Sequence, residues 1–182
     1  MIASIVALAI PLLSPSPVHA ALTSHAPIYI NGNSGFTKPD PVNGGGSGTE
    51  NDPYIIENWD ISAENANGIW VENTTAYFTV RSCYIHGGAT YKCGIRLDNV
   101  KNGGIYNNLV ENSYTGILLG SSDNIKMRSN TLSNNRFNFN VYGTTLSNFT
   151  HDIDTSNLVN GKPIRYLVDN KNGIIGPSLD TG

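Results

Sequence analysis

The chain has 182 residues, and its 11 Lys and Arg against 14 Asp and Glu give a net charge near −3. Without a basic stretch it lacks the electrostatic footprint of a nucleic-acid-binding protein, so we expect no nucleic-acid partner. Its 39% hydrophobic content is ordinary for a folded chain, and 19 glycines indicate many tight turns. The length fits one domain, and the composition favours an all-β protein over disorder.

Residues 1–20 have the pattern of a secretory signal peptide. Residues 2–13 form an apolar core too short to span a bilayer, and Val18-His19-Ala20 offers small residues at the cleavage positions. The segment has no Lys or Arg ahead of the apolar core, so a buried N-terminal apolar segment is the alternative. We expect an exported protein, either secreted, periplasmic or at the cell surface, with no membrane span in the mature chain.

Residues 21–65 are expected to form an N-terminal cap and entry coil. Pro27-Ile28-Tyr29-Ile30 reads as a short strand, and a loop rich in Gly, Asn and Pro follows. The residues after this segment repeat, and a repeat array needs its first coil covered. The alternative is a calcium site formed by Asp52, Glu57 and Asp60, although their spacing does not match an EF-hand loop.

Residues 66–182 contain a repeat of about 22 residues. A glycine followed by alternating apolar residues recurs at Gly68, Gly94 and Gly116. The step from Gly68 to Gly94 is longer than the step from Gly94 to Gly116. A weaker copy is centred on Asn138, and the step from Gly116 to Asn138 equals the step from Gly94 to Gly116. A fixed period in the twenties indicates a solenoid, in which each coil is buried by its neighbours. The multi-leucine pattern and helical segment of leucine-rich repeats are missing.

Side chains after each glycine alternate with the period of two that is typical of a strand. The expected inward residues are Ile69, Val71, Ile95, Leu97, Ile117, Leu119, Phe139 and Val141. The expected outward residues are Trp70, Glu72, Arg96, Asp98, Leu118, Gly120, Asn140 and Tyr142. A second strand places Arg81, Tyr106 and Arg128 outward, and a third buries Ile85, Val110 and Leu132. Three short strands per coil predict a parallel β-helix.

The corners between the strands are rich in asparagine. Asn108 and Asn130 fall at the same corner of successive coils. An amide there tolerates a left-handed backbone and can bond the backbone or the asparagine one coil away. We therefore expect these amides to fix the register, while the buried apolar stack supplies most of the stability.

The longer first step of the repeat reflects a loop between Cys83 and Cys93. In an exported protein, two cysteines that flank an insertion predict a disulfide. The alternative is a buried thiol at Cys83, which takes the corner position of Asn108. Asn73 and Asn148 begin acceptor sequons for N-glycosylation, relevant in a host that glycosylates exported proteins.

Beyond Val141 the repeat loosens. Asn157 resembles another corner residue, but the step from Asn130 to Asn157 is longer than the step from Asn108 to Asn130. A turn near Gly161 then precedes the strand-like residues 165–168. No cap is evident before Gly182, so we expect the repeats to be truncated there and the chain to be the N-terminal part of a longer protein.

Three stretches resemble the NosD-like parallel β-helix proteins of archaeal and bacterial cell surfaces, a group within the carbohydrate-binding and sugar-hydrolase (CASH) class. They are Pro27 to Gly32, Gly46 to Glu57, and Asp152 to Ile164, which contains Asn160-Gly161-Lys162-Pro163. The resemblance covers most of the mature chain. It implies a right-handed coil, in keeping with the general preference of parallel crossovers, but it does not fix an activity.

The sequence favours a non-catalytic cell-surface scaffold or carbohydrate-binding module. The β-helix flank would present columns of outward side chains to an extracellular polysaccharide or another component of the cell envelope. Aromatic faces stack on sugars, and Arg or Asp bonds hydroxyls, so the candidate glycan-binding residues are Trp70, Arg96, Glu72, Asp98 and Tyr106. An ordinary solvated surface is the alternative for each of these residues.

Two other functions stay open. A polysaccharide lyase or hydrolase would use carboxylates such as Glu72 and Asp98 one coil apart, but the signatures of β-helix pectin hydrolases are absent. A copper-processing accessory of nitrous oxide reductase, from which the NosD-like label derives, would use clustered His, Cys and Met. Only His86 lies near Cys83 and Cys93 in the sequence. We therefore expect no cofactor, metal ligand or catalytic residue.

Overall fold

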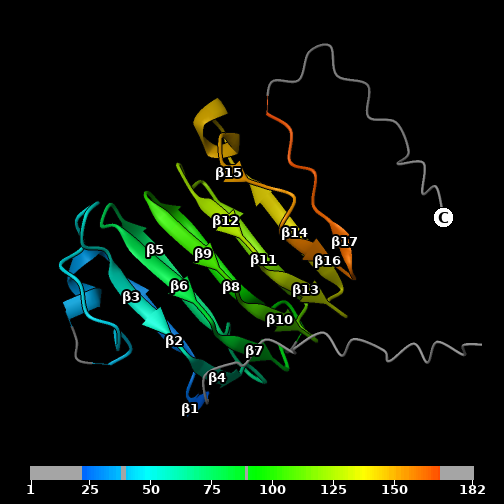
Figure 1. Ribbon diagram of the computed structural model, residues 1–182, viewed down its shortest axis with the longest axis horizontal. Helices are drawn as coiled ribbons and strands as arrows, with labels where there is room; N and C mark the ends of the chain where they lie inside the picture. The colour runs from blue at the N-terminus through cyan, green and yellow to red at the C-terminus, as the bar shows by residue number, and fades with distance from the viewer. Residues whose placement is uncertain (1–21, 38–39, 89, 169–182) are drawn as a thin grey trace, which may run out of the picture.

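The computed structural model describes residues 22–37, 40–88 and 90–168, so the expected signal peptide and residues 169–182 lie outside the described part. The chain winds as a solenoid whose strands are stacked coil on coil (Figure 1). Three sheets form its sides, and all pairings between successive coils are parallel. The all-β parallel solenoid expected from the repeat is confirmed.

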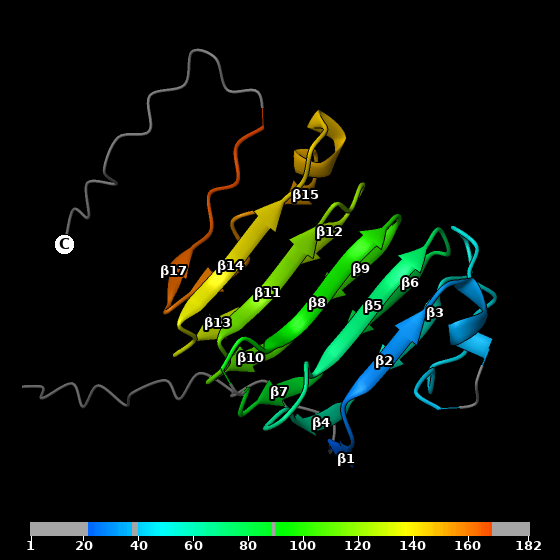
Figure 2. The same ribbon diagram turned by 180° about the vertical axis from the view of Figure 1, so that it is seen from behind.

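Each sheet takes one strand from each coil. The β8 sheet contains, in spatial order, β14 (Phe137–Tyr142), β11 (Thr115–Gly120), β8 (Cys93–Val100), β5 (Ile69–Thr74) and β2 (Ile28–Asn31), side by side in Figure 2. The β9 sheet contains β15 (Asp152–Ile153), β12 (Lys126–Arg128), β9 (Gly103–Tyr106), β6 (Phe78–Arg81) and β3 (Tyr54–Glu57). The β10 sheet contains β1 (Thr23–His25), β4 (Trp59–Ser62), β7 (Tyr84–His86), β10 (Leu109–Glu111), β13 (Thr131–Ser133), β16 (Leu158–Val159) and the antiparallel β17 (Lys162–Pro163).

The core is a set of apolar columns that run along the solenoid axis. Ile69, Ile95 and Ile117 are register partners in β5, β8 and β11, and all three are fully buried. Phe139 continues this column in β14 and is half-buried, because no further strand of the described chain covers that side. Burying one such side chain stabilises the fold by about 1.5–3 kcal/mol. These columns therefore supply most of the stability of the coil stack.

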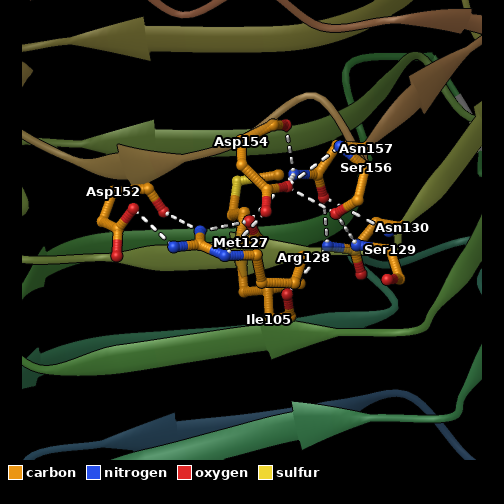
Figure 3. Close-up of polar contacts among 9 residues, drawn as sticks. All are labelled: Ile105, Met127, Arg128, Ser129, Asn130, Asp152, Asp154, Ser156 and Asn157. Atoms are coloured by element: carbon orange, nitrogen blue, oxygen red, sulfur yellow. Dashed lines mark hydrogen bonds and ion pairs between the residues drawn. The ribbon is translucent and has the colours of Figure 1, made fainter.

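An asparagine ladder joins the coils at the corner before the β10 sheet, and Figure 3 shows the bond between two of its members, Asn130 and Asn157. The Nδ2 atom of Asn108 donates to Asn130 Oδ1 at 3.0 Å, and that of Asn130 donates to Asn157 Oδ1 at 2.7 Å. The expected pairing between coils is confirmed. The expected left-handed backbone falls one residue earlier, at Asn107 (φ 54°) and Ser129 (φ 56°). The turn residue thus points outward, and the next side chain is directed into the core.

The two ends of the solenoid differ. At the N-terminal end, the 3₁₀ helix η1 (Asn33–Thr37) places Phe36 against Tyr54, with ring centroids 4.9 Å apart, and against Phe78. At the other end, a second 3₁₀ helix, η2 (Leu146–Phe149), follows β14, and residues 165–168 form no strand. The strand expected there was wrong, because the hairpin of β16 and β17 takes the chain out of the coil.

The disulfide expected between Cys83 and Cys93 is not formed, since both cysteines are free and buried. Cys83 precedes β7 and Cys93 opens β8, so β7 and its following loop separate them. The Cys83 thiol donates to the Arg81 carbonyl at 3.3 Å, and burial raises its pKa to about 11. The alternative interpretation of Cys83, a small buried thiol in the asparagine corner, matches this structure.

Candidate functional site

The outer surface of the β8 sheet brings together four of the five candidate binding residues. Tyr29, Trp70 and Arg96 are register partners in β2, β5 and β8 and point outward as one column. The Tyr29 and Trp70 rings lie 4.7 Å apart, and the Arg96 guanidinium lies 4.8 Å from the Trp70 ring centroid. The indole is therefore flanked on one side by an aromatic ring and on the other by a cation.

Glu72 and Asp98 form the neighbouring column of the same surface. The Tyr29 hydroxyl donates to Glu72, while Asp98 accepts from Arg96 Nε at 2.5 Å and from the Tyr142 hydroxyl at 2.5 Å. Burial and the bond to Asp98 raise the pKa of Tyr142. These carboxylates are thus tied to neighbours on the same sheet.

A glycine makes the contact between Tyr142 and Asp98 possible. Gly120 lies between them in register, and a Cβ there would come within 2.2 Å of Asp98 Oδ1 and 2.4 Å of the Tyr142 ring. Any larger residue would push the tyrosine away from the carboxylate. The alternation in the sequence placed Gly120 outward, but it gave no sign of this contact two coils apart.

A groove lies beside Trp70 at the start of β5. It has a volume of about 210 Å³, and its wall includes Tyr29, Trp70, Asn65, Asn67 and Lys92. The Asn67 Oδ1 accepts from the Cys93 backbone at 2.9 Å, which fixes the amide in place. The groove therefore combines two aromatic rings with amide and ammonium groups, a composition that suits a hydroxylated ligand. Sequence alternation missed Asn67 and Lys92 because both lie in the loops between strands.

Tyr106, the fifth candidate residue, lies on a different surface. It points outward from the β9 sheet, in register with Arg81 and Arg128. Arg81 pairs with Glu57 at 2.6 Å, and Arg128 pairs with Asp152 at 2.5 Å. Figure 3 shows Arg128 linking β12 to β15 in this way. The structure therefore separates Tyr106 from the group around Trp70.

The residues considered for a metal site do not converge. His86 bonds Asp60 at 3.0 Å and stacks on Tyr84, with ring centroids 4.5 Å apart. Within residues 22–37, 40–88 and 90–168, no group of three or more His, Cys, Asp or Glu side chains has the geometry to hold a metal ion. Glu57 is paired with Arg81 and Asp60 with His86, so two of the three acidic residues considered for calcium have separate partners.

The two glycosylation sequons differ in accessibility. Asn73 is exposed at a corner, while Asn148 is buried and its Nδ2 donates to Asp123 at 2.8 Å. Asn73 is therefore the sequon that the folded chain presents to solvent. Modification at either position stays a prediction.

The three sheets of short, parallel strands define the fold as a parallel β-solenoid. A sequence model described as the right-handed beta helix region matches residues 24–175, so the chain belongs to this family. Comparisons with curated proteins and with solved structures gave no significant match. In the described part of the chain, no helix has the length and apolar character needed to cross a membrane.

Proposed function

We propose that this protein is an exported, non-catalytic cell-surface β-helix that binds an extracellular polysaccharide through the groove beside Trp70. The observation that carries this proposal is the groove itself, with its paired Tyr29 and Trp70 rings. The signal-peptide pattern and the resemblance to NosD-like surface proteins support the extracellular location.

The rigid column next to the groove favours an extended ligand. Successive coils place outward side chains about 4.8 Å apart, so Tyr29, Trp70 and Arg96 form a continuous strip along the solenoid. The strip is held by ring contacts and by the Arg96–Asp98 pair, so little side-chain entropy is lost when a ligand binds.

Binding is favoured over hydrolysis by the state of the two carboxylates. Both oxygens of Asp98 accept hydrogen bonds, from Arg96 and Tyr142, and Glu72 is engaged by Tyr29 and Asn31. A general acid or nucleophile must face the scissile bond, whereas these groups are turned along the sheet. We therefore propose no reaction for this surface.

A glycan array probed with the secreted protein tests the proposal. We expect retention on specific polysaccharides, weakened at least tenfold by Trp70→Ala and by Lys92→Ala. Tyr91→Ala is the matched control, because this tyrosine is 75% exposed outside the groove. If both groove variants unfold thermally like the parent and their retention is unchanged, binding at the groove is refuted. Retention on no glycan would refute the function.

A further inference from the structure

A second, smaller hollow lies on the outside of the β9 sheet. It has a volume of about 140 Å³, and its lining includes Glu50, Tyr77, Thr79, Tyr106 and Lys126. A hollow of this size holds several water molecules, which is the scale of one small ring. The hollow shares no lining residue with the groove beside Trp70.

Glycine at position 104 creates the floor of the hollow. Thr79, Gly104 and Lys126 are register partners in β6, β9 and β12 and face outward. A Cβ on Gly104 would meet the Tyr106 ring at 2.5 Å, so this ring leans across the glycine. Thr79 is buried although it faces outward, because the hollow is recessed between the Tyr106 ring and the loop that contains Glu50.

Five of the polar side chains around the hollow are not tied to neighbours as those of the β8 sheet are. Two other lining residues are: Asn102 Nδ2 donates to the Thr75 carbonyl at 3.1 Å, and Asn124 Nδ2 donates to Asn102 Oδ1 at 2.9 Å. In the part of the chain that the structure describes, no hydrogen bond is formed by the side chains of Glu50, Tyr77, Thr79, Tyr106 or Lys126. Only Thr79 among them is buried, while Tyr77 and Tyr106 are half-buried and Glu50 and Lys126 are exposed, so a ligand could bond all five without breaking a bond between protein groups. On the β8 sheet, by contrast, Glu72 and Asp98 are already engaged.

The chemistry of the lining selects the ligand. The carboxylate of Glu50 accepts, the ammonium of Lys126 donates, and the hydroxyls of Thr79, Tyr77 and Tyr106 do both. One acid and one base balance each other, which disfavours a charged ligand. The two tyrosine rings offer faces for the C–H edges of a saturated ring.

We propose that this hollow binds a single neutral sugar ring, as a terminal or side-branch residue. The inference rests on residues separate from those of the groove beside Trp70, so either site can fail without the other. Thr79 positions a ring hydroxyl at the floor, and Tyr106 covers one side of the ring.

Amide chemical-shift mapping of the ¹⁵N-labelled full chain tests the proposal directly. The probes are glucose, galactose, mannose, N-acetylglucosamine and glucuronate, each titrated to high concentration. We expect a neutral sugar to shift the amides of Gly103 and Gly104. Thr79→Val, which keeps the side-chain shape, should weaken binding roughly three- to tenfold by removing one hydrogen-bonding group. Tyr106→Ala should weaken it more than tenfold.

Matched variants separate this site from stability effects and from the groove. Thr131→Val makes the same change on β13, away from the hollow, and should leave binding unchanged. Trp70→Ala should also leave it unchanged. The proposal is overturned if no neutral sugar shifts the β9 amides, if only glucuronate does so, or if Thr79→Val binds as tightly as the parent.

Discussion

Asn130 is the middle member of the asparagine ladder, so its replacement tests how strongly the ladder ties the coils together. Asn130 is fully buried, and its Nδ2 donates to the Ile105 carbonyl at 2.8 Å and to Asn157 Oδ1 at 2.7 Å. Its Oδ1 accepts from the backbone nitrogen and the Nδ2 of Asn108, at 3.1 and 3.0 Å. Asn130→Leu keeps a similar volume and removes all four hydrogen bonds.

The size of the effect follows from the groups left behind. The Asn108 backbone N–H and the Ile105 carbonyl lose these partners inside the corner. A buried polar group without a partner costs about 1–3 kcal/mol, so we expect Asn130→Leu to lower the free energy of unfolding by about 2–6 kcal/mol. Domains are stable by only about 5–15 kcal/mol, so the loss is a large fraction of the total.

Urea unfolding followed by far-UV circular dichroism measures this loss. The matched control is Asn140→Leu, which makes the same change at an exposed position of β14 and should alter stability by less than about 0.5 kcal/mol. A loss below about 1 kcal/mol for Asn130→Leu would refute the reasoning, because the ladder would then contribute no more than a typical single hydrogen bond does.

Three further predictions follow from burial. Ile117→Asn buries an unpaired amide and should lower the free energy of unfolding by more than about 4 kcal/mol. Arg96→Ala breaks a partly exposed ion pair and should lower it by less than about 1 kcal/mol, and equal urea midpoints for the two variants would contradict the inward and outward assignment. Burial lowers the pKa of His151 in the folded protein. The contribution of this residue to stability should therefore be constant above about pH 6.5, the pKa of histidine in the unfolded chain, and should be lost as the pH falls below that value. His151→Phe should reduce the change of the urea midpoint between pH 7 and pH 5. Burial raises the pKa of the Cys83 and Cys93 thiols, so both should resist alkylation at pH 8 in the native protein and both should react in urea. Mass spectrometry measures the alkylation, and a mass that shows a disulfide would contradict the prediction.

The fold could be predicted because the repeat carries it redundantly. The inward isoleucine Ile69 recurs as Ile95 in the next coil and as Ile117 in the one after, so each copy supports the register that the others indicate. Side-chain alternation then decides which residues are buried. At the C-terminal end the turn near Gly161 was predicted, but the antiparallel hairpin that it closes between β16 and β17 was not, because apolar patterning alone does not distinguish such a hairpin from another coil.

The site was less predictable, for a geometric reason. Alternation tells whether Tyr106 or Trp70 points outward, but the two belong to different sheets of the coil, whose outer surfaces face different directions. Lys92 and Asn67 lie in loops between strands, where no periodicity marks them. The contact of Tyr142 with Asp98 depends on the missing side chain of Gly120 between them.

The hydrogen-bond state of each surface links stability to recognition. On the β8 sheet, Asp98 is bonded to Arg96 and Tyr142, so a ligand that used this carboxylate would first have to break those bonds. Around the hollow on the β9 sheet, Thr79 and Tyr106 form no such bonds within the described chain, and a ligand hydroxyl would replace only water. A carboxylate that is bonded to its neighbours, as Asp98 is, therefore serves the stacking of the coils, whereas outward polar groups without such bonds are free to bond a ligand.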